Sequence, residues 1–156
     1  NQPADRAPPL KLSMYFTLDE MTLSQTAIRN GIDNTPNEMA LGNLHRLARE
    51  LDRVRVILGA PVFISSGYRG IELNTRVGGS SRSAHMFGRA ADFTCPGFGP
   101  PRKIVETLKA EMVEFDQLIC EFDRWVHFGI HEFDAVPRRQ VLEIDANGCR
   151  PFEVSE

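Results

Sequence analysis

Two short segments of alternating apolar and polar residues place the strongest constraint on how this chain can fold. In residues 125–130 every second residue is apolar, so one face of an extended strand is suited to a core and His127 lies on the other face. Residues 89–95 repeat the pattern, with Asp92 on the face that the apolar residues leave free. If the two strands are neighbours in one sheet, Asp92 and His127 lie together on its polar surface.

A second imidazole precedes this carboxylate by seven residues. His85 and Asp92 cannot share a helical face if Asp92 lies on a strand, and the spacing suits a loop that returns over the strand that follows. Gly88 and the small Ala90 permit such a close return. Together with His127, these residues offer two imidazoles and one carboxylate, ligand types that hold a catalytic zinc with one position left open. Water at that position ionises near neutral pH and becomes a nucleophile.

The remaining pattern predicts one α+β domain with a small, mainly antiparallel sheet flanked by helices. Thr35 and Pro36 have the form of a helix cap and first helical residue, apolar residues then recur at three- and four-residue steps, and Gly59 ends the helix. A capping box is expected at Thr22, before a short helix that ends at Gly31. Further helices are expected at about 71–80 and 102–113, and strands at 61–65, 89–95, 115–121, 125–130 and 139–144. Residues 1–12 are predicted to be a flexible lead-in and 13–156 a single domain.

Composition excludes several classes of function. The net charge is −3, and the 18 basic residues form no dense block, so nucleic acid is not an expected partner. No apolar run is long enough for a membrane helix, so stable membrane insertion is not expected. Three widely spaced cysteines predict neither a disulfide framework nor a thiolate zinc site. The N-terminus lacks the apolar core of a signal peptide, but the chain begins without Met, which leaves export by a removed leader open.

The metal-ligand pattern is also the basis of a family resemblance. The run SxHxxGxAxD at 83–92, followed by WVH at 125–127, closely resembles a family of zinc peptidases. The family includes D-alanyl-D-alanine carboxypeptidases and phage endolysins that cut the L-alanyl-D-glutamate bond of bacterial cell-wall peptides, and the Hedgehog signalling domain shares its fold. Residues 65–69 are similar to the family's Ser-Gly-Tyr-Arg segment, and residues 15–20 and 31–36 are similar to a phage-associated branch.

This resemblance implies a set of zinc ligands and a general base. His85, Asp92 and His127 would bind one zinc ion, with water in the fourth position. The base that takes the proton from that water would be Glu121, six residues before the last ligand as in the Hedgehog-type arrangement, or Asp123, four residues before it. Some relatives place the acid three residues before the ligand, where this chain has an arginine that cannot serve. Both carboxylates stay open from the sequence, with Glu121 favoured.

Three further residues are expected to bind substrate. Arg69 matches an arginine thought to bind a substrate carboxylate or to steady the developing oxyanion, and a planar guanidinium suits either task. Ser83 is expected to bond substrate, to orient His85 or simply to cap its loop. Trp125 is expected to form a wall of the cleft or to pack in an ordinary way. His131 shares strand parity with His127 and is expected at the rim of the cleft.

The resemblance therefore implies a metallopeptidase that hydrolyses peptidoglycan stem peptides, acting at the bacterial cell wall or periplasm. An endopeptidase and a D,D-carboxypeptidase both fit, and a phage or a bacterial origin fits equally. Without a leader, the protein would reach the wall through a phage holin pore or on a phage particle. The alternatives are a non-catalytic metal-binding module of the same fold, and a virion component that uses the same chemistry during entry.

Overall fold

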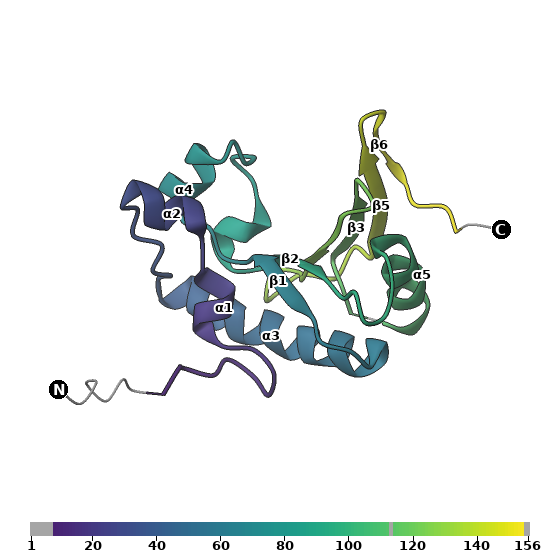
Figure 1. Cartoon of the computed structure of the whole chain (residues 1–156), viewed down its shortest axis with the longest axis horizontal. Coiled ribbons are helices and arrows are strands. Elements are labelled where there is room, and N and C mark those ends of the chain that lie inside the picture. The colour runs from purple at the N-terminus through teal and green to yellow at the C-terminus, as the bar shows by residue number, and fades with distance from the viewer. Residues whose placement is uncertain (1–7, 113, 155–156) are drawn as a thin grey trace.

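A computed structural model describes residues 8–112 and 114–154. It is an α+β structure built on one six-stranded sheet with the order β1-β2-β4-β3-β5-β6 (Figure 1). The helices are α1 (Leu18–Thr22), α2 (Gln25–Asn30), α3 (Glu38–Leu58), α4 (Ile71–Arg76), α5 (Pro101–Glu111) and the 3-10 helix η1 (Ala84–Phe87). The strands are β1 (Phe63–Ser66), β2 (Ala90–Thr94), β3 (Gln117–Glu121), β4 (Trp125–Gly129), β5 (Gln140–Asp145) and β6 (Gly148–Pro151).

The two alternating segments are adjacent strands, as the sequence predicts. Strands β2 and β4 pair antiparallel, and Asp92 lies directly opposite His127. Strands β3 and β4 form the expected hairpin. One face of these three strands is fully buried and belongs to one core with α3 and α5, so both helices cover the same face of the sheet. Its residues are Ala91, Phe93, Leu118, Cys120, Val126 and Phe128. The polar residues of β2 and β4 are therefore left on the opposite face.

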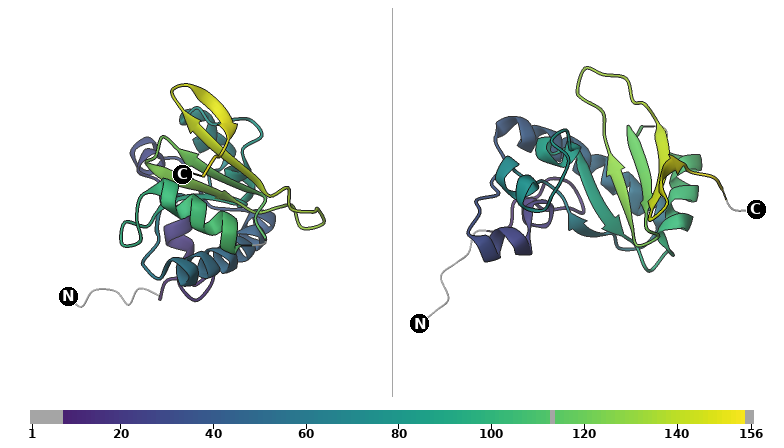
Figure 2. Two further views of the ribbon diagram at one scale, coloured as in Figure 1. Left: turned by 90° about the vertical axis from the view of Figure 1, so that its right-hand side faces the viewer. Right: turned by 90° about the horizontal axis from the view of Figure 1, so that it is seen from above.

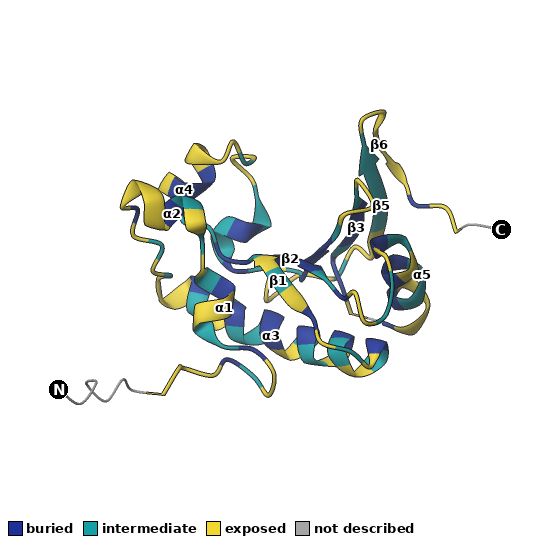
Figure 3. Cartoon of the chain, viewed as in Figure 1, coloured by how far each residue is buried: buried dark blue, intermediate teal, exposed yellow. Residues whose placement is uncertain are grey.

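Helix α3 supplies the largest part of that core. Its buried residues recur along one side, which is visible as a dark stripe in Figure 3. The sequence predicts Thr35 as the cap, but the N-cap is Asn37, whose side chain accepts a hydrogen bond from the Ala40 N–H at 2.8 Å. Thr35 instead bonds Asp33 through its hydroxyl. Thr35 and Asn37 are both residue types that cap helices, and the helix begins after Asn37 because its side chain accepts the hydrogen bond from a free backbone N–H of the first turn.

The C-terminal part of the sheet differs from the prediction. The last expected strand forms β5, but it pairs parallel to β3, so the sheet is mixed and only mainly antiparallel. Strand β6 was not predicted; it returns from β5 through the turn at Asn147 and Gly148 and pairs antiparallel to it. All residues of β6 are exposed, so it carries no burial pattern that a sequence could reveal (Figure 3).

The N-terminal segment also departs from the predicted boundaries. Residues 1–7 of the predicted lead-in lie outside the described residues. Leu12, near its end, is only 5% exposed and packs in the main core, so it belongs to the folded body. The capping box lies at Thr17 and Glu20, where it starts α1, whereas the box was expected at Thr22. Ser24 caps α2, and Gly31 ends it as predicted.

All three cysteines are free; Cys95 and Cys120 are buried, and Cys149 is exposed. Burial raises the pKa of the Cys120 thiol to about 11, so it is uncharged at neutral pH. Among the described residues, no helix combines the length and the apolar composition needed to cross a bilayer.

Gly88 connects the loop that carries His85 to strand β2. It adopts a left-handed conformation with φ 72°, and a Cβ at this position would lie 2.5 Å from the Ala40 carbonyl oxygen of α3. The chain can therefore turn tightly over α3 only because this residue has no side chain. The predicted close return is confirmed, with helix α3 as the surface against which the loop turns.

We expect Gly88→Ala to lower the free energy of unfolding by about 3 kcal/mol, the sum of left-handed strain and overpacking. Gly59→Ala is the matched control, because Gly59 has a similar φ of 65° but open space around its Cβ position. Left-handed backbone strain alone should lower the free energy of unfolding of the Gly59→Ala control by about 1 kcal/mol. Urea denaturation of both variants measures the difference, and equal losses would show that the contact with α3 is unimportant.

Candidate metal centre

Three side chains from separate parts of the chain meet on the open face of the sheet. His85 comes from η1, Asp92 from β2 and His127 from β4. Asp92 Oδ1 lies 3.3 Å from His85 Nε2 and 2.9 Å from His127 Nδ1. Ligand atoms of the three residues all lie within 4.8 Å of one another, and both histidines are buried. The structure thus brings together the three residues that the sequence singles out.

The orientation of His85 is fixed by a backbone carbonyl. Its Nδ1 lies 2.7 Å from the Gly67 carbonyl oxygen, so Nδ1 donates its proton to that carbonyl and Nε2 is the nitrogen that faces Asp92. A metal-binding histidine commonly donates its second N–H in this way. The sequence motif includes Gly67 but does not reveal this contact, because the partner is a main-chain atom 18 residues away.

Gly67 reaches this position by packing closely against α1. A Cβ on Gly67 would overlap the Met21 carbonyl oxygen, so any side chain there would push the segment away. The same carbonyl accepts a hydrogen bond from the Tyr68 N–H at 2.7 Å, and the Arg69 N–H donates to the His85 carbonyl at 3.0 Å. The segment 67–69 is therefore held between the end of α1 and the loop that carries His85.

Asp92 is held in its charged form. Burial by itself raises the pKa of this carboxyl, but hydrogen bonds and charge interactions with His127 and His85 outweigh burial and lower the pKa well below its ordinary value. Asp92 is thus an anion at any pH near neutrality. One carboxylate between two imidazoles is a set of hard and borderline donors that suits a divalent transition metal.

The donor set fits zinc in particular. Nitrogen and oxygen ligands lie about 2.0–2.2 Å from a tetrahedral zinc, which separates neighbouring ligand atoms by roughly 3.4 Å. The distances from Asp92 Oδ1 to the two ring nitrogens, 3.3 and 2.9 Å, are close to that separation. Three protein ligands leave a fourth position for water or substrate, which is the arrangement of catalytic rather than structural zinc sites.

The cluster lies in a cleft with a volume of about 780 Å³. Its floor is the sheet face opposite α3 and α5, where β4 presents Trp125, His127 and Gly129 in succession. A loop of residues 130–139, between β4 and β5, projects from the sheet beside this floor (Figure 2). The cleft extends in both directions from His127, so it can hold an extended chain.

Glu121 shares this cleft with the metal cluster. It lies at the end of β3, opposite Trp125 in the register, and lines the cleft. Burial raises the pKa of the Glu121 carboxyl, and the charge of Asp92 raises it further. His127 and Arg69 oppose this rise without cancelling it. A carboxylate with a raised pKa is a better proton acceptor, as a general base requires.

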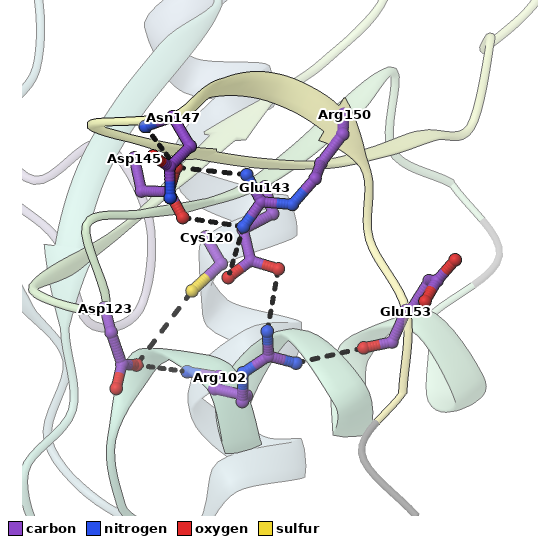
Figure 4. A network of polar contacts seen from close by, with 8 residues as sticks. All are labelled: Arg102, Cys120, Asp123, Glu143, Asp145, Asn147, Arg150 and Glu153. Carbon is purple, nitrogen blue, oxygen red and sulfur yellow. Dashed lines mark hydrogen bonds and ion pairs between the residues drawn. The ribbon is translucent and has the colours of Figure 1, made fainter.

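Asp123 is used elsewhere. It lies in the β3–β4 turn with a φ of 48°, and its Oδ1 accepts a hydrogen bond from the Arg102 N–H at 3.1 Å, at the start of α5. Figure 4 shows Asp123 in a polar network with Arg102 and Glu143. It is absent from the described residues that line the cleft. Of the two candidate bases, the structure places only Glu121 beside the cluster.

The three expected substrate-binding residues all line the cleft. The Arg69 Nε and the Trp125 Nε1 are buried, and neither has a hydrogen-bond partner among the described residues. Ser83 caps η1 by accepting from the His85 N–H at 3.2 Å, and its hydroxyl lies 3.5 Å from an Arg69 nitrogen. Two buried donors without acceptors on the wall of a cleft are positioned to bind oxygen atoms of a ligand.

Two histidines lie outside the cluster: His131, expected at the rim of the cleft, and His45, which the sequence pattern indicates is a surface or structural residue of the long helix. His131 lines the cleft beyond Gly129, and its Nδ1 is buried with no partner among the described residues. His45, expected to be structural, lies on α3 with its Nδ1 3.1 Å from the Leu12 carbonyl oxygen. His45 therefore contributes to packing of the N-terminal segment and not to the cleft.

A His–Asp–His cluster at the floor of an open cleft, with another carboxylate beside it, is typical of metal-dependent hydrolases. Comparison with models of protein families matches residues 14–129 to the family described as Peptidase M15. The match covers more than half of the chain, so this protein belongs to that family of zinc peptidases of the D-Ala-D-Ala carboxypeptidase type. The comparison with curated proteins found no match. The family resemblance inferred from the sequence motifs is confirmed.

Replacing one of the three clustered residues should abolish tight zinc binding. We expect His127→Ala to weaken zinc affinity by more than about 100-fold, beyond the loss that follows when a residue merely orients a ligand. His45→Ala should bind zinc like the wild type, because His45 bonds a distant carbonyl. Competition with a chromophoric chelator measures both affinities. Unchanged affinity in His127→Ala would mean that this cluster is not the metal site.

Proposed function

We propose that this protein is a zinc-dependent peptidase that hydrolyses peptidoglycan stem peptides. The observation that carries the proposal is the shared cleft, in which Glu121 lies beside the cluster of His85, Asp92 and His127. Membership of the Peptidase M15 family supports peptide hydrolysis. Peptidoglycan as the substrate rests on the family resemblance, and with it the site of action at the bacterial cell wall.

His85, Asp92 and His127 would hold the metal through two neutral imidazoles and one carboxylate. When bound, zinc supplies Lewis-acid chemistry: it polarises the scissile carbonyl and acidifies water near neutral pH. The Gly67 carbonyl accepts from Nδ1 of His85 and so directs Nε2 toward the cluster, and the ring needs no reorientation before it binds. The anionic Asp92 adds charge attraction for a dication.

Glu121 would move the proton. Its carboxylate accepts a proton from the attacking water and passes it to the leaving amine, which must be protonated before it departs. Its raised pKa suits both transfers, because the group takes the proton readily and is still acidic enough to release it. Asp92, with a lowered pKa on the same face, would hold the metal and not exchange protons.

The unpaired donors of the cleft would bind the peptide. Arg69 is half-buried and charged, and its Nε, unpaired among the described residues, can bind a carbonyl oxygen that gains negative charge, or a terminal carboxylate. Trp125 can donate its indole N–H either to substrate or to the nearby Glu121 carboxylate. Ser83, which already caps η1 and lies near Arg69, would act mainly by positioning these two elements.

The fold we propose is that of the D-Ala-D-Ala peptidases and the Hedgehog domain. The presence of Glu121 in the cleft favours hydrolysis over the alternative of a non-catalytic metal-binding module. Both an endopeptidase and a D,D-carboxypeptidase are compatible with a cleft whose lining extends to both sides of His127 along β4. A virion component that opens the wall during entry, or an endolysin that depends on a holin, would use the same residues.

Digestion of purified peptidoglycan, with mass spectrometry of the fragments, tests the proposed activity. Loss of one terminal alanine would identify a carboxypeptidase, and release between L-alanine and D-glutamate an endopeptidase. Both activities should disappear with a chelator and return with added zinc. Intact wall peptides in the presence of zinc would overturn the proposal.

Glu121→Gln should keep zinc but lose about 10²- to 10⁴-fold in kcat, the usual contribution of a general base. Asp123→Asn is the matched control, because an amide oxygen can still accept the Arg102 N–H bond, and it should retain near-normal turnover. Steady-state kinetics together with the zinc content of each variant make the comparison. The opposite pattern would assign the base to Asp123.

A further inference from the structure

The cleft continues well beyond the metal cluster. We call its far end the distal cleft and define it by Arg89, Gln117, Gly129, His131 and Arg138, all of which line the same cavity as His127. Gly129 follows His127 by two residues on β4 and lies opposite Gln117 of β3. Two residues of a strand span roughly 7 Å. The distal cleft is therefore about two peptide residues from the metal cluster.

Arg138 is held rigidly at this end. Its Nε and Nη2 donate to both oxygens of Asp116, with distances of 2.8–3.2 Å, and its backbone N–H also donates to Asp116 Oδ1. Asp116 is itself fixed between strands, since its N–H bonds Gly129 and its carbonyl accepts from Gln140. Only 13% of the Asp116 side chain is exposed. The carboxylate thus fixes the plane of the guanidinium.

This pairing leaves part of the guanidinium available. The Arg138 side chain is 60% exposed, and its Nη1 has no hydrogen-bond partner among the described residues. A guanidinium that is already ordered loses little conformational freedom when it binds a second anion. Asp116 is largely buried and its charge is satisfied by Arg138, while the exposed side of the same guanidinium stays available to a ligand in the cleft.

Arg89 provides a second cation at the same end. Its side chain is only 15% exposed, and its nearest carboxylate is Glu132, 3.7 Å away and 75% exposed. That pair is too long for a strong hydrogen bond and can separate at low cost. Gln117 donates to the Gln140 side chain, and its own amide oxygen accepts no hydrogen bond from any described residue. The distal cleft thus contains two guanidinium groups on a polar floor.

We propose that Arg138, held by Asp116 and assisted by Arg89, binds a carboxylate on the stem-peptide residue two positions from the scissile bond. This inference rests on the proposed function. The third residue of the stem lies two positions from either candidate bond: it follows the scissile bond in a cut at L-alanyl-D-glutamate and precedes it in a cut at D-alanyl-D-alanine. The distal cleft receives this residue in both cases, with the peptide running in opposite directions along β4. The chemistry therefore favours a third residue whose side chain ends in a carboxylate, such as diaminopimelate, over lysine.

The test uses three synthetic pentapeptide stems that differ only at the third residue: meso-diaminopimelate, its side-chain carboxamide, and lysine. We measure kcat and KM with the zinc-loaded wild type, and equilibrium binding with the zinc-loaded Glu121→Gln variant by titration calorimetry. The wild type should prefer the acid over the amide by about 10- to 100-fold in kcat/KM, the effect of one charge-assisted hydrogen bond. Binding to the Glu121→Gln variant should show the same preference.

Arg138→Gln should remove this preference through KM, with little change in kcat for the lysine peptide. Arg150→Gln is the matched control, because Arg150 makes a similar two-bond pair with Asp145 on β5, outside the cleft (Figure 4). It should behave like the wild type. Equal binding of acid and amide, or equal weakening of both in Arg138→Gln, would overturn the subsite. Acid-selective binding without turnover of any stem would instead overturn the proposed hydrolysis.

Discussion

The antiparallel pairing of β2 with β4 is the interaction on which the rest of the structure depends. Its register sets Asp92 opposite His127 on one face, and the adjacent apolar residues of both strands against α3 and α5 on the other. Because side chains alternate along a strand, a slip of one residue would put a polar ligand into the core and an apolar residue into the cleft. The hydrophobic core and the metal cluster are thus fixed by the same hydrogen bonds.

Two carboxylates on the same sheet face, Asp92 and Glu121, have pKa values shifted in opposite directions, which suits them to different chemical roles. Asp92 lies between two imidazoles, which hold its pKa low, whereas Glu121 is buried beside that negative charge, which pushes its pKa up. Surroundings that lower one pKa and raise the other keep Asp92 permanently anionic and allow Glu121 to exchange protons. Asp123, only two residues further along, serves instead at the start of α5, because the turn directs it toward Arg102.

Local patterns in the sequence predicted the parts of the structure that follow from burial. Alternation around His127 gave the strand faces correctly, and apolar periodicity gave the long helix α3. Features that depend on distant backbone atoms could not be predicted. The Gly67 carbonyl that orients His85 leaves no mark in residue identity, and neither does the pairing of Asp116 with Arg138 across the β4–β5 connection. The exposed strand β6 lacks the alternation that marks a half-buried strand, so the sequence predicted no strand there.

The contact between Gly67 and Met21 links the start of the chain to the chemistry in the cleft. The end of the short helix α1 packs against segment 67–69, which in turn orients the imidazole of His85. A truncation or domain fusion that disturbs α1 would consequently displace His85, a candidate metal ligand more than sixty residues further along the chain. Engineers who wish to graft this catalytic sheet onto another scaffold must carry the first helix with it, even though that helix contributes no ligand of its own.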